Sequence, residues 1–294
     1  MRVLMIASEA SPFSKTGGLG DVLGALPRAL ARLGHVVDVV VPRYRGTTAG
    51  ERVGALRVAL GRQVADASVW TARLDGVRAV FIEHPPYYDR EHLYGAGGRD
   101  YADNPERFAC LCQAALEWAA AAGWPHDVIH AHDWQAGLTP VLLARQAPLP
   151  RRVPVVFTIH NLAYQGLFDA SWLPRLGLGW DLMHIGAMEY WGQISFLKAG
   201  IVFSRIVTTV SPRYAQEIQT PEYGFGFDGI LRARAADLVG ILNGIDYDEW
   251  DPQRDPHLPQ PYSASNLAGK AAAKRQLLER YGLPAGPEAL ERPL

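Results

Sequence analysis

The segment HAHDW at residues 130–134 carries side chains that suit metal chemistry. His130 and His132 stand two residues apart, so on a strand their side chains would point the same way. Together with Asp133 and His160 they would supply ligands for zinc or iron, which makes a metal-dependent hydrolase one interpretation. However, the fixed local spacings of metallohydrolases do not continue downstream, and a core or hydrogen-bonding role is favoured for His130.

Sugar chemistry offers another interpretation of the same residue types. Transfer at an anomeric carbon builds oxocarbenium-like positive charge, and a nearby carboxylate stabilises that charge. Asp133, Asp21 and Glu9 are candidates for this carboxylate by their positions, and the sequence does not choose among them. A histidine such as His160 can donate hydrogen bonds to sugar hydroxyls.

A glycine-rich segment, KTGGLGDV at residues 15–22, joins a predicted strand to a predicted helix. Its glycines let backbone N–H groups approach a ligand, and the helix N-terminus behind them favours an anion. Lys15 adds a positive charge that suits a phosphate. A dinucleotide fingerprint fits poorly, because Gly18 and Gly20 match its first two positions but the third falls on Leu23. A purely structural glycine loop is the other alternative.

The elements that would position these residues are short apolar strands that alternate with helices. The predicted strands span residues 3–7, 36–41, 77–83, 127–131, 153–159, 205–210 and 238–242, and the predicted helices span residues 21–33, 106–122, 136–145 and 270–281. This order predicts an α/β protein with a doubly wound, mostly parallel Rossmann-like sheet. Ligands bind such sheets beyond the carboxyl ends of the strands, where these polar residues stand.

The composition excludes several classes of protein. The net charge is −1, so neither nucleic acid nor a membrane surface is an expected partner. The apolar run near the N-terminus is shorter than the ~7–15 residues of a signal-peptide core, and no stretch approaches the ~18 apolar residues of a membrane span. Cys110 and Cys112 fit buried residues better than a disulfide. A soluble, cytoplasmic protein is expected.

Eight segments, taken in order, resemble the family of glycogen and starch synthases. They are KTGGLGDV (15–22), HLYG (92–95), YADNPERFA (101–109), HAHDW (130–134), FTIHNLAYQG (157–166), GQISFLKAG (192–200), VSP (210–212) and ILNGID (241–246). The resemblance extends from residue 1 to about residue 280. The ordered set is specific, whereas no single segment would suffice.

The resemblance implies half of a GT-B enzyme, in which two Rossmann-like domains face each other across a cleft. Such an enzyme would transfer glucose from ADP-glucose to the non-reducing end of an α-1,4-glucan such as glycogen, with retention and without a metal ion. Residues 1–245 would form the acceptor-side catalytic domain, and residues 246–294 a proline-rich linker and a helix, with the second domain missing. Little or no activity is therefore expected of this chain alone. A non-catalytic glucan-binding module is the alternative.

The resemblance also implies the site residues. Lys15, Gly17 and Gly18 would approach the glucose and distal phosphate of the donor. The glucose and acceptor pocket would be lined by Asp21, Tyr94, Asp133, His160, Asn161, Gln165 and Asn243. The expected catalytic residues are His160, Asp133 and Lys15, with His160 beside the transferred sugar. No cofactor is expected besides the donor substrate.

Overall fold

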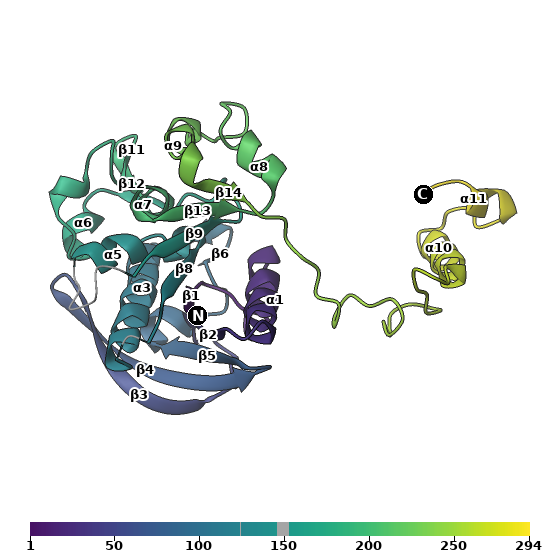
Figure 1. Ribbon diagram of the computed structural model, residues 1–294, viewed down its shortest axis with the longest axis horizontal. Helices are drawn as coiled ribbons and strands as arrows, with labels where there is room; N and C mark the ends of the chain where they lie inside the picture. Colours follow the sequence, from purple (N-terminus) through teal and green to yellow (C-terminus); the bar gives the residue numbers. More distant parts are fainter. Residues whose placement is uncertain (124, 146–152) are drawn as a thin grey trace. The chain divides into compact units, whose positions relative to one another are not determined.

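The computed structural model describes residues 1–123, 125–145 and 153–294 (Figure 1). The chain forms two compact units, Met1–Asn243 and Gly244–Leu294. The second unit contains the helices α10 (Ala268–Arg280) and α11 (Pro287–Glu291). All the other helices and strands of the described residues belong to the first unit.

A large sheet runs through the first unit, in the order β14-β13-β9-β8-β1-β2-β5-β4-β3. Its strands are β1 (Arg2–Ile6), β2 (Val36–Pro42), β3 (Glu51–Leu60), β4 (Gln63–Leu74), β5 (Val77–Glu83), β8 (Val128–His132), β9 (Val155–Ile159), β13 (Ile206–Thr209) and β14 (Leu238–Gly240). Every neighbouring pair is parallel except β4 with β3 and with β5. The predicted mostly parallel, Rossmann-like α/β sheet is confirmed.

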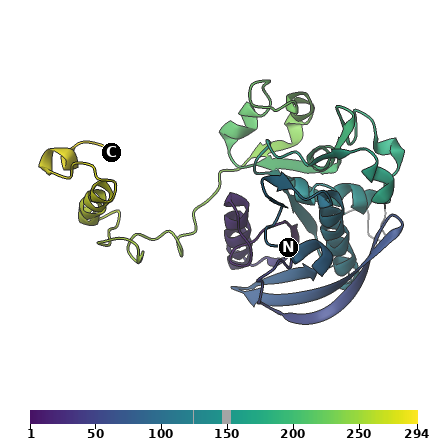
Figure 2. The same cartoon turned by 180° about the vertical axis from the view of Figure 1, so that it is seen from behind.

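Helices cover both faces of this sheet, with α1 on one side and α3 on the other (Figures 1 and 2). The helices are α1 (Gly18–Arg32), α2 (Pro85–Tyr88), α3 (Asn104–Ala121), α4 (Asp133–Ala136), α5 (Thr139–Arg145), α6 (Trp172–Arg175), α7 (Phe196–Phe203), α8 (Pro212–Glu217) and α9 (Asp228–Ala233). Successive side chains of a strand point to opposite faces, so β1 places Leu4 and Ile6 in the core under α3, and Val3 and Met5 in the core under α1.

Short strands extend the loops around the sheet. They are β6 (Gly95–Ala96), β7 (Arg99–Asp100), β10 (Leu167–Asp169), β11 (Glu189–Tyr190) and β12 (Gln193–Ser195), and 3-10 turns stand at Trp180–Leu182 and Ala235–Asp237.

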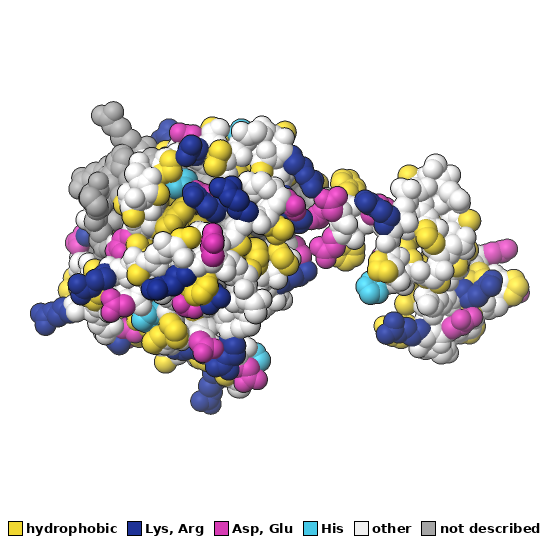
Figure 3. Space-filling view, turned by 90° about the horizontal axis from the view of Figure 1, so that it is seen from below, with side chains coloured by type: hydrophobic (Ala, Val, Ile, Leu, Met, Phe, Trp, Pro, Cys, Tyr) yellow, Lys and Arg dark blue, Asp and Glu magenta, His cyan; other side chains and the backbone are white. Residues whose placement is uncertain are grey.

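On the face shown in Figure 3, basic and acidic side chains are interspersed and form no large patch of one sign. Among the residues described, no helix is long and apolar enough to cross a membrane.

The local structure departs from the sequence prediction in several places, three of which concern the large sheet and the helices that follow β8. The antiparallel strands β3 and β4 were not predicted, because β3 is exposed along most of its length and lacks an apolar alternation. The helix predicted over residues 136–145 is two helices, α4 and α5, separated near Gly137, where a Cβ would lie 2.0 Å from the Phe196 carbonyl oxygen. The strand β8 runs one residue further than predicted and includes His132.

The strand order brings the site segments together. The strands β9, β8 and β1 are parallel neighbours, so their carboxyl ends meet at one edge of the sheet. Lys15 stands in the loop after β1, Asp133 directly follows β8, and His160 directly follows β9. Three segments far apart in sequence therefore lie at the same edge, as ligand sites of open parallel sheets require.

Candidate functional site

Three histidines form a continuous cluster at this edge. The ring centroids of His130 and His132 lie 4.0 Å apart, which confirms that both point to one side of β8. Nδ1 of His132 lies 3.0 Å from Nε2 of His160. Nε2 of His130 lies 2.6 Å from the hydroxyl of Thr158, which lies 2.6 Å from the hydroxyl of Thr208. The imidazoles thus bond to each other and to hydroxyls.

This arrangement does not favour the metal-dependent hydrolase. Metal ligands direct their lone pairs toward a common point, whereas His132 and His160 direct nitrogens at each other. Within residues 1–123, 125–145 and 153–294, no group of three or more His, Cys, Asp or Glu side chains is placed to hold a metal ion.

Burial keeps the histidine cluster neutral. It lowers the pKa of His130 and of His160 to about 4, and it holds the pKa of His132 well below its usual value. Removing an imidazolium from water is unfavourable, and protonated neighbours would repel each other. At neutral pH each ring therefore carries one proton, so each can donate one hydrogen bond and accept another.

Asp133 stands beside this cluster in a strained backbone conformation. Its φ of 56° lies in the left-handed region, which a short polar side chain tolerates better than most residues. The carboxylate, 8% exposed, accepts a hydrogen bond of 2.7 Å from the backbone N–H of His160. Burial raises the pKa of Asp133 to about 7, although hydrogen bonds from the backbone N–H groups of His160 and Asn161 act in the opposite direction. The side chain is poised between its acid and its carboxylate near neutral pH.

A second carboxylate, Glu9, links two of the predicted site segments. It accepts hydrogen bonds from the Tyr94 hydroxyl and from both the backbone N–H and, at 2.7 Å, the hydroxyl of Thr16. The Tyr94 hydroxyl also lies 2.8 Å from the Ser8 hydroxyl. Glu9 is only 3% exposed, and donors of the protein itself occupy its oxygens. It connects the glycine loop to Tyr94.

The segment at residues 101–109 donates hydrogen bonds to the loop that carries Tyr94. The Asn104 side chain donates to the Tyr94 carbonyl at 2.9 Å, and the fully buried Arg107 donates to the Leu93 carbonyl at 2.8 Å. Arg107 also donates to the Tyr87 carbonyl at 2.7 Å. Sequence reasoning gave no role to Asn104, Arg107 or Thr16, because contacts between loops distant in sequence leave no local signal.

The glycine loop leaves space at the N-terminus of α1. Gly17 has an extended φ of −161°, and a Cβ added to Gly17 or to Gly18 would meet nothing within 4 Å. Neither a left-handed backbone conformation nor crowding within the chain requires glycine at these two positions. Nζ of Lys15 forms an ion pair of 2.5 Å with Asp21 beside this space, and both side chains are more than 40% exposed.

The other predicted residues lie on loops. Asn161 follows His160 and accepts a hydrogen bond of 3.0 Å from the Ala163 backbone N–H. Gln165 donates to the Phe225 carbonyl at 2.9 Å, and Asn243 is exposed after β14. An ion pair thus joins Lys15 to Asp21 and a hydrogen bond joins Asp133 to His160, whereas the hydrogen bond of the Gln165 side chain goes to Phe225, outside the predicted set.

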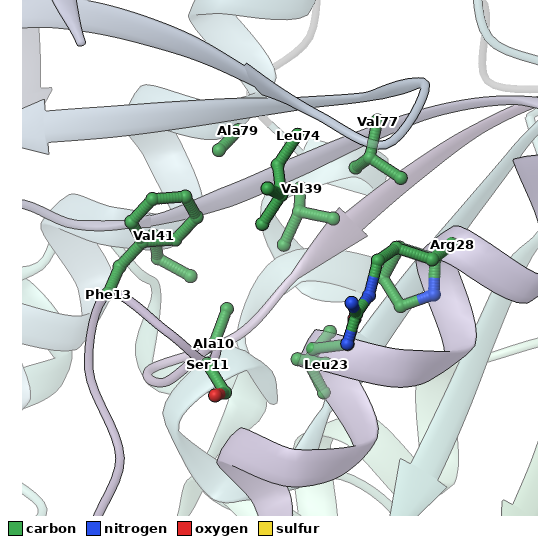
Figure 4. Close-up of a pocket in the computed structure, with 12 residues that line it drawn as sticks. Ala10, Ser11, Phe13, Leu23, Arg28, Val39, Val41, Leu74, Val77 and Ala79 are labelled. Atoms are coloured by element: carbon green, nitrogen blue, oxygen red, sulfur yellow. The ribbon is translucent and has the colours of Figure 1, made fainter. Parts of the chain in front are cut away.

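The pocket of Figure 4 is lined by other residues than the histidine cluster and its neighbours. It lies between α1 and the sheet face formed by β2 and β5, and aliphatic side chains and the ring of Phe13 line most of it. Ser11 and Arg28 are polar members of its lining, and it contains none of the predicted site residues. It is a feature of the smaller core.

The fold and this edge define a class of protein. The model of the family described as starch synthase catalytic domain matches residues 2–233. The chain therefore belongs to the starch synthase catalytic domain family, and its sheet is the Rossmann-like half of a GT-B glycosyltransferase, as the sequence predicted.

Particular relatives agree with this assignment. The chain is 51% identical to a glycogen synthase of Anaeromyxobacter sp. (strain Fw109-5), over 98% of this chain and 61% of that protein. It is 48% identical to a glycogen synthase of Koribacter versatilis (strain Ellin345), over 97% of this chain and 60% of that protein. The solved catalytic domain of starch synthase IV from Arabidopsis thaliana, bound to ADP and acarbose, superimposes with a TM-score of 0.85 at 34% identity, covering 97% of this chain and 60% of that one. The chain thus spans about 61% of the length of these curated relatives.

Proposed function

We propose that this chain is the acceptor-side half of a glycogen or starch synthase, which transfers glucose from ADP-glucose to the non-reducing end of an α-1,4-glucan with retention. Residues 1–245 would be the catalytic domain of this half, and residues 246–294 its linker and helix. The observation that carries the proposal is the meeting of the glycine loop, Asp133 and His160 at the ends of three neighbouring strands.

The glycine loop suits the phosphates of the donor. The N-terminus of the 15-residue helix α1 carries partial positive charge, and no atom of the chain lies within 4 Å of a Cβ added at Gly17 or Gly18. Lys15 adds a full positive charge, held by Asp21 at the same end of the helix. This combination would bind the distal phosphate and stabilise the charge that the leaving diphosphate develops.

Asp133 and His160 suit the transferred glucose. A carboxylate next to the anomeric carbon would stabilise oxocarbenium-like charge, and Asp133 becomes a carboxylate as the pH rises through about 7. A neutral His160 would donate a hydrogen bond to a sugar hydroxyl. The buried Glu9 holds the Tyr94 hydroxyl at the same edge, where Tyr94, Asn161, Gln165 and Asn243 would line the glucose and acceptor pocket.

The relatives support the choice of partners. The starch synthase IV catalytic domain, of which this chain covers 60%, is bound to ADP and acarbose. ADP-glucose and an α-1,4-glucan such as glycogen are accordingly the proposed substrates. The net charge of −1 indicates no nucleic-acid partner, and a cytoplasmic location is proposed with the enzyme.

A chimera tests the proposal. Residues 1–294 would be joined to the remaining portion of the Anaeromyxobacter glycogen synthase that they match, and ADP release from ADP-glucose and glycogen would be measured. We expect turnover approaching the ~10 per second of a typical enzyme, a loss of at least about 100-fold in Lys15→Ala, and little or no turnover by residues 1–294 alone. An inactive but folded chimera that still binds glycogen would favour the non-catalytic glucan-binding module instead.

A further inference from the structure

His132 is the member of the histidine cluster to which the proposed reaction gives no role. Its ring is fully buried at the carboxyl end of β8, and its Nδ1 lies 3.0 Å from Nε2 of His160. At this distance the two nitrogens share one proton in a hydrogen bond, so one ring donates and the other accepts. The direction of that bond decides whether His160 offers a donor or a lone pair to a ligand.

The remaining nitrogen of each ring indicates the direction. Nε2 of His132 is buried and has no hydrogen-bond partner among the described residues. Nδ1 of His160 makes no hydrogen bond to those residues either, but it is not enclosed, because His160 is only half-buried. A buried N–H without an acceptor is rarer and more costly than an unpaired acceptor. The proton of His132 therefore belongs on Nδ1, where Nε2 of His160 accepts it.

The surroundings of His132 keep this bond from being lost by protonation. The ring of His130 packs against it at 4.0 Å, and Asp133, the next residue, directs its carboxyl group to the His160 backbone N–H. Burial and the two histidine neighbours hold the pKa of His132 well below its usual value. The ring is thus a neutral donor near pH 7.

We propose that His132 is a positioning residue that holds His160 with its proton on Nδ1, so that His160 presents an N–H donor to a sugar oxygen. The use of this donor rests on the proposed function, whereas the position of the proton does not. In the opposite arrangement His160 would present a lone pair and would accept from a hydroxyl instead.

Nuclear magnetic resonance of residues 1–294 with ¹⁵N-labelled histidine tests the position of the proton. Long-range ¹H–¹⁵N spectra distinguish protonated from unprotonated ring nitrogens. We expect Nδ1 to be protonated and Nε2 unprotonated in both His132 and His160. A wild-type spectrum in which His160 carries its proton on Nε2 would overturn the proposal without any variant having to fold.

Two substitutions and a control then test the role of His132. His132→Phe keeps an aromatic ring but removes the donor, so His160 should shift to a mixture that includes the Nε2–H form. His132→Asn places an amide N–H near the position of Nδ1 and should restore the Nδ1–H form. His130→Phe preserves the ring packing without touching the bond to His160 and should leave the His160 spectrum unchanged. An unchanged His160 spectrum in His132→Phe would contradict the assignment.

Binding of maltoheptaose separates this proposal from the proposed function. We expect His132→Phe to weaken binding about 5-fold, the size of one neutral hydrogen bond, and His132→Asn to bind like the wild type. Equal affinity in His132→Phe and the wild type would contradict the positioning role. Absence of wild-type binding, with the expected proton positions observed, would instead refute the glucan site and leave the proton assignment standing.

Discussion

At the scale of single residues, the site depends on groups whose ionisation is set by burial. Asp133 and the three histidines are shifted in opposite directions, because burial opposes the charged form of each. Near pH 7 the cluster therefore contains neutral rings beside a carboxyl group in mid-titration. Such shifts are typical of functional sites, where one group must hold a proton while its neighbour gives one up.

The raised pKa of Asp133 predicts a pH-dependent effect on stability. Between the unfolded pKa of 3.8 and the folded pKa of about 7, the folded state binds more protons, so this group destabilises the protein increasingly as the pH rises through that window. Asp133→Asn removes the ionisation, and asparagine tolerates a positive φ. Urea denaturation should show that Asp133→Asn gains stability relative to the wild type between pH 5 and pH 8, by on the order of 2 kcal/mol. A stability difference that does not vary with pH would refute the raised pKa.

The hydrogen bonds that the Glu9 carboxylate accepts predict how two substitutions of Glu9 change stability. Glu9→Ala would remove the carboxylate that accepts from the exposed Thr16 and the half-buried Tyr94, at a cost of about 2 kcal/mol in the free energy of unfolding. Glu9→Gln should cost about 1 kcal/mol, because its amide oxygen can still accept from the Thr16 N–H while the hydroxyls turn to accept from its NH₂ group. Equal losses in the two variants, measured by urea denaturation, would argue against this network.

At the scale of elements, the parallel strands were predictable and their contacts were not. Runs such as residues 36–41 and 77–83 are apolar because both faces of β2 and β5 are covered, and the residues that follow them mark the functional edge. The exposed strand β3 carries no such signal, since solvent replaces the buried neighbour that imposes a pattern.

The candidate site likewise contains some residues with a local sequence signal and some contacts without one. Asp133 and His160 were candidates from the sequence because a polar residue after an apolar strand is a local signal. The bond from Tyr94 to Glu9 joins residues 85 positions apart, and only the folded chain reveals it. The direction of the His132 bond depends on which nitrogen is enclosed, which no local pattern encodes.

The N-terminus of α1 gives an element-scale prediction. Gly18→Ala adds a methyl group into open space at a helical position, so stability should stay equal or rise by about 0.5–1 kcal/mol. The same methyl group would obstruct the approach of a phosphate, so ADP release by the chimera should fall at least about 10-fold. Gly24→Ala is the matched control, because its Cβ would lie 2.9 Å from the Ser11 Cβ and should destabilise the fold by about 1–3 kcal/mol. A Gly18→Ala chimera with full activity would show that no ligand approaches this glycine.

At the scale of the whole molecule, the chain supplies one wall of the proposed transfer site. It spans about 61% of the length of its curated relatives. The compact unit Met1–Asn243 contains the glycine loop, Asp133 and His160, so sugar and phosphate contacts of this half should form without further residues. We expect Lys15 and the glycine loop to stabilise the leaving diphosphate only in part, so binding and turnover should be separable in this chain.

Ligand-induced shifts in the backbone spectrum of residues 1–294 test the central claim most directly. Titration with maltoheptaose and, separately, with ADP-glucose should give saturable binding with dissociation constants on the order of millimolar, as expected for one wall of a site. The sugar should shift resonances of Tyr94, Asp133 and His160, and the nucleotide sugar should also shift those of Lys15 and Gly18. Binding that shifts residues elsewhere while leaving Lys15 and His160 unperturbed would contradict a single transfer site at the carboxyl edge of the sheet.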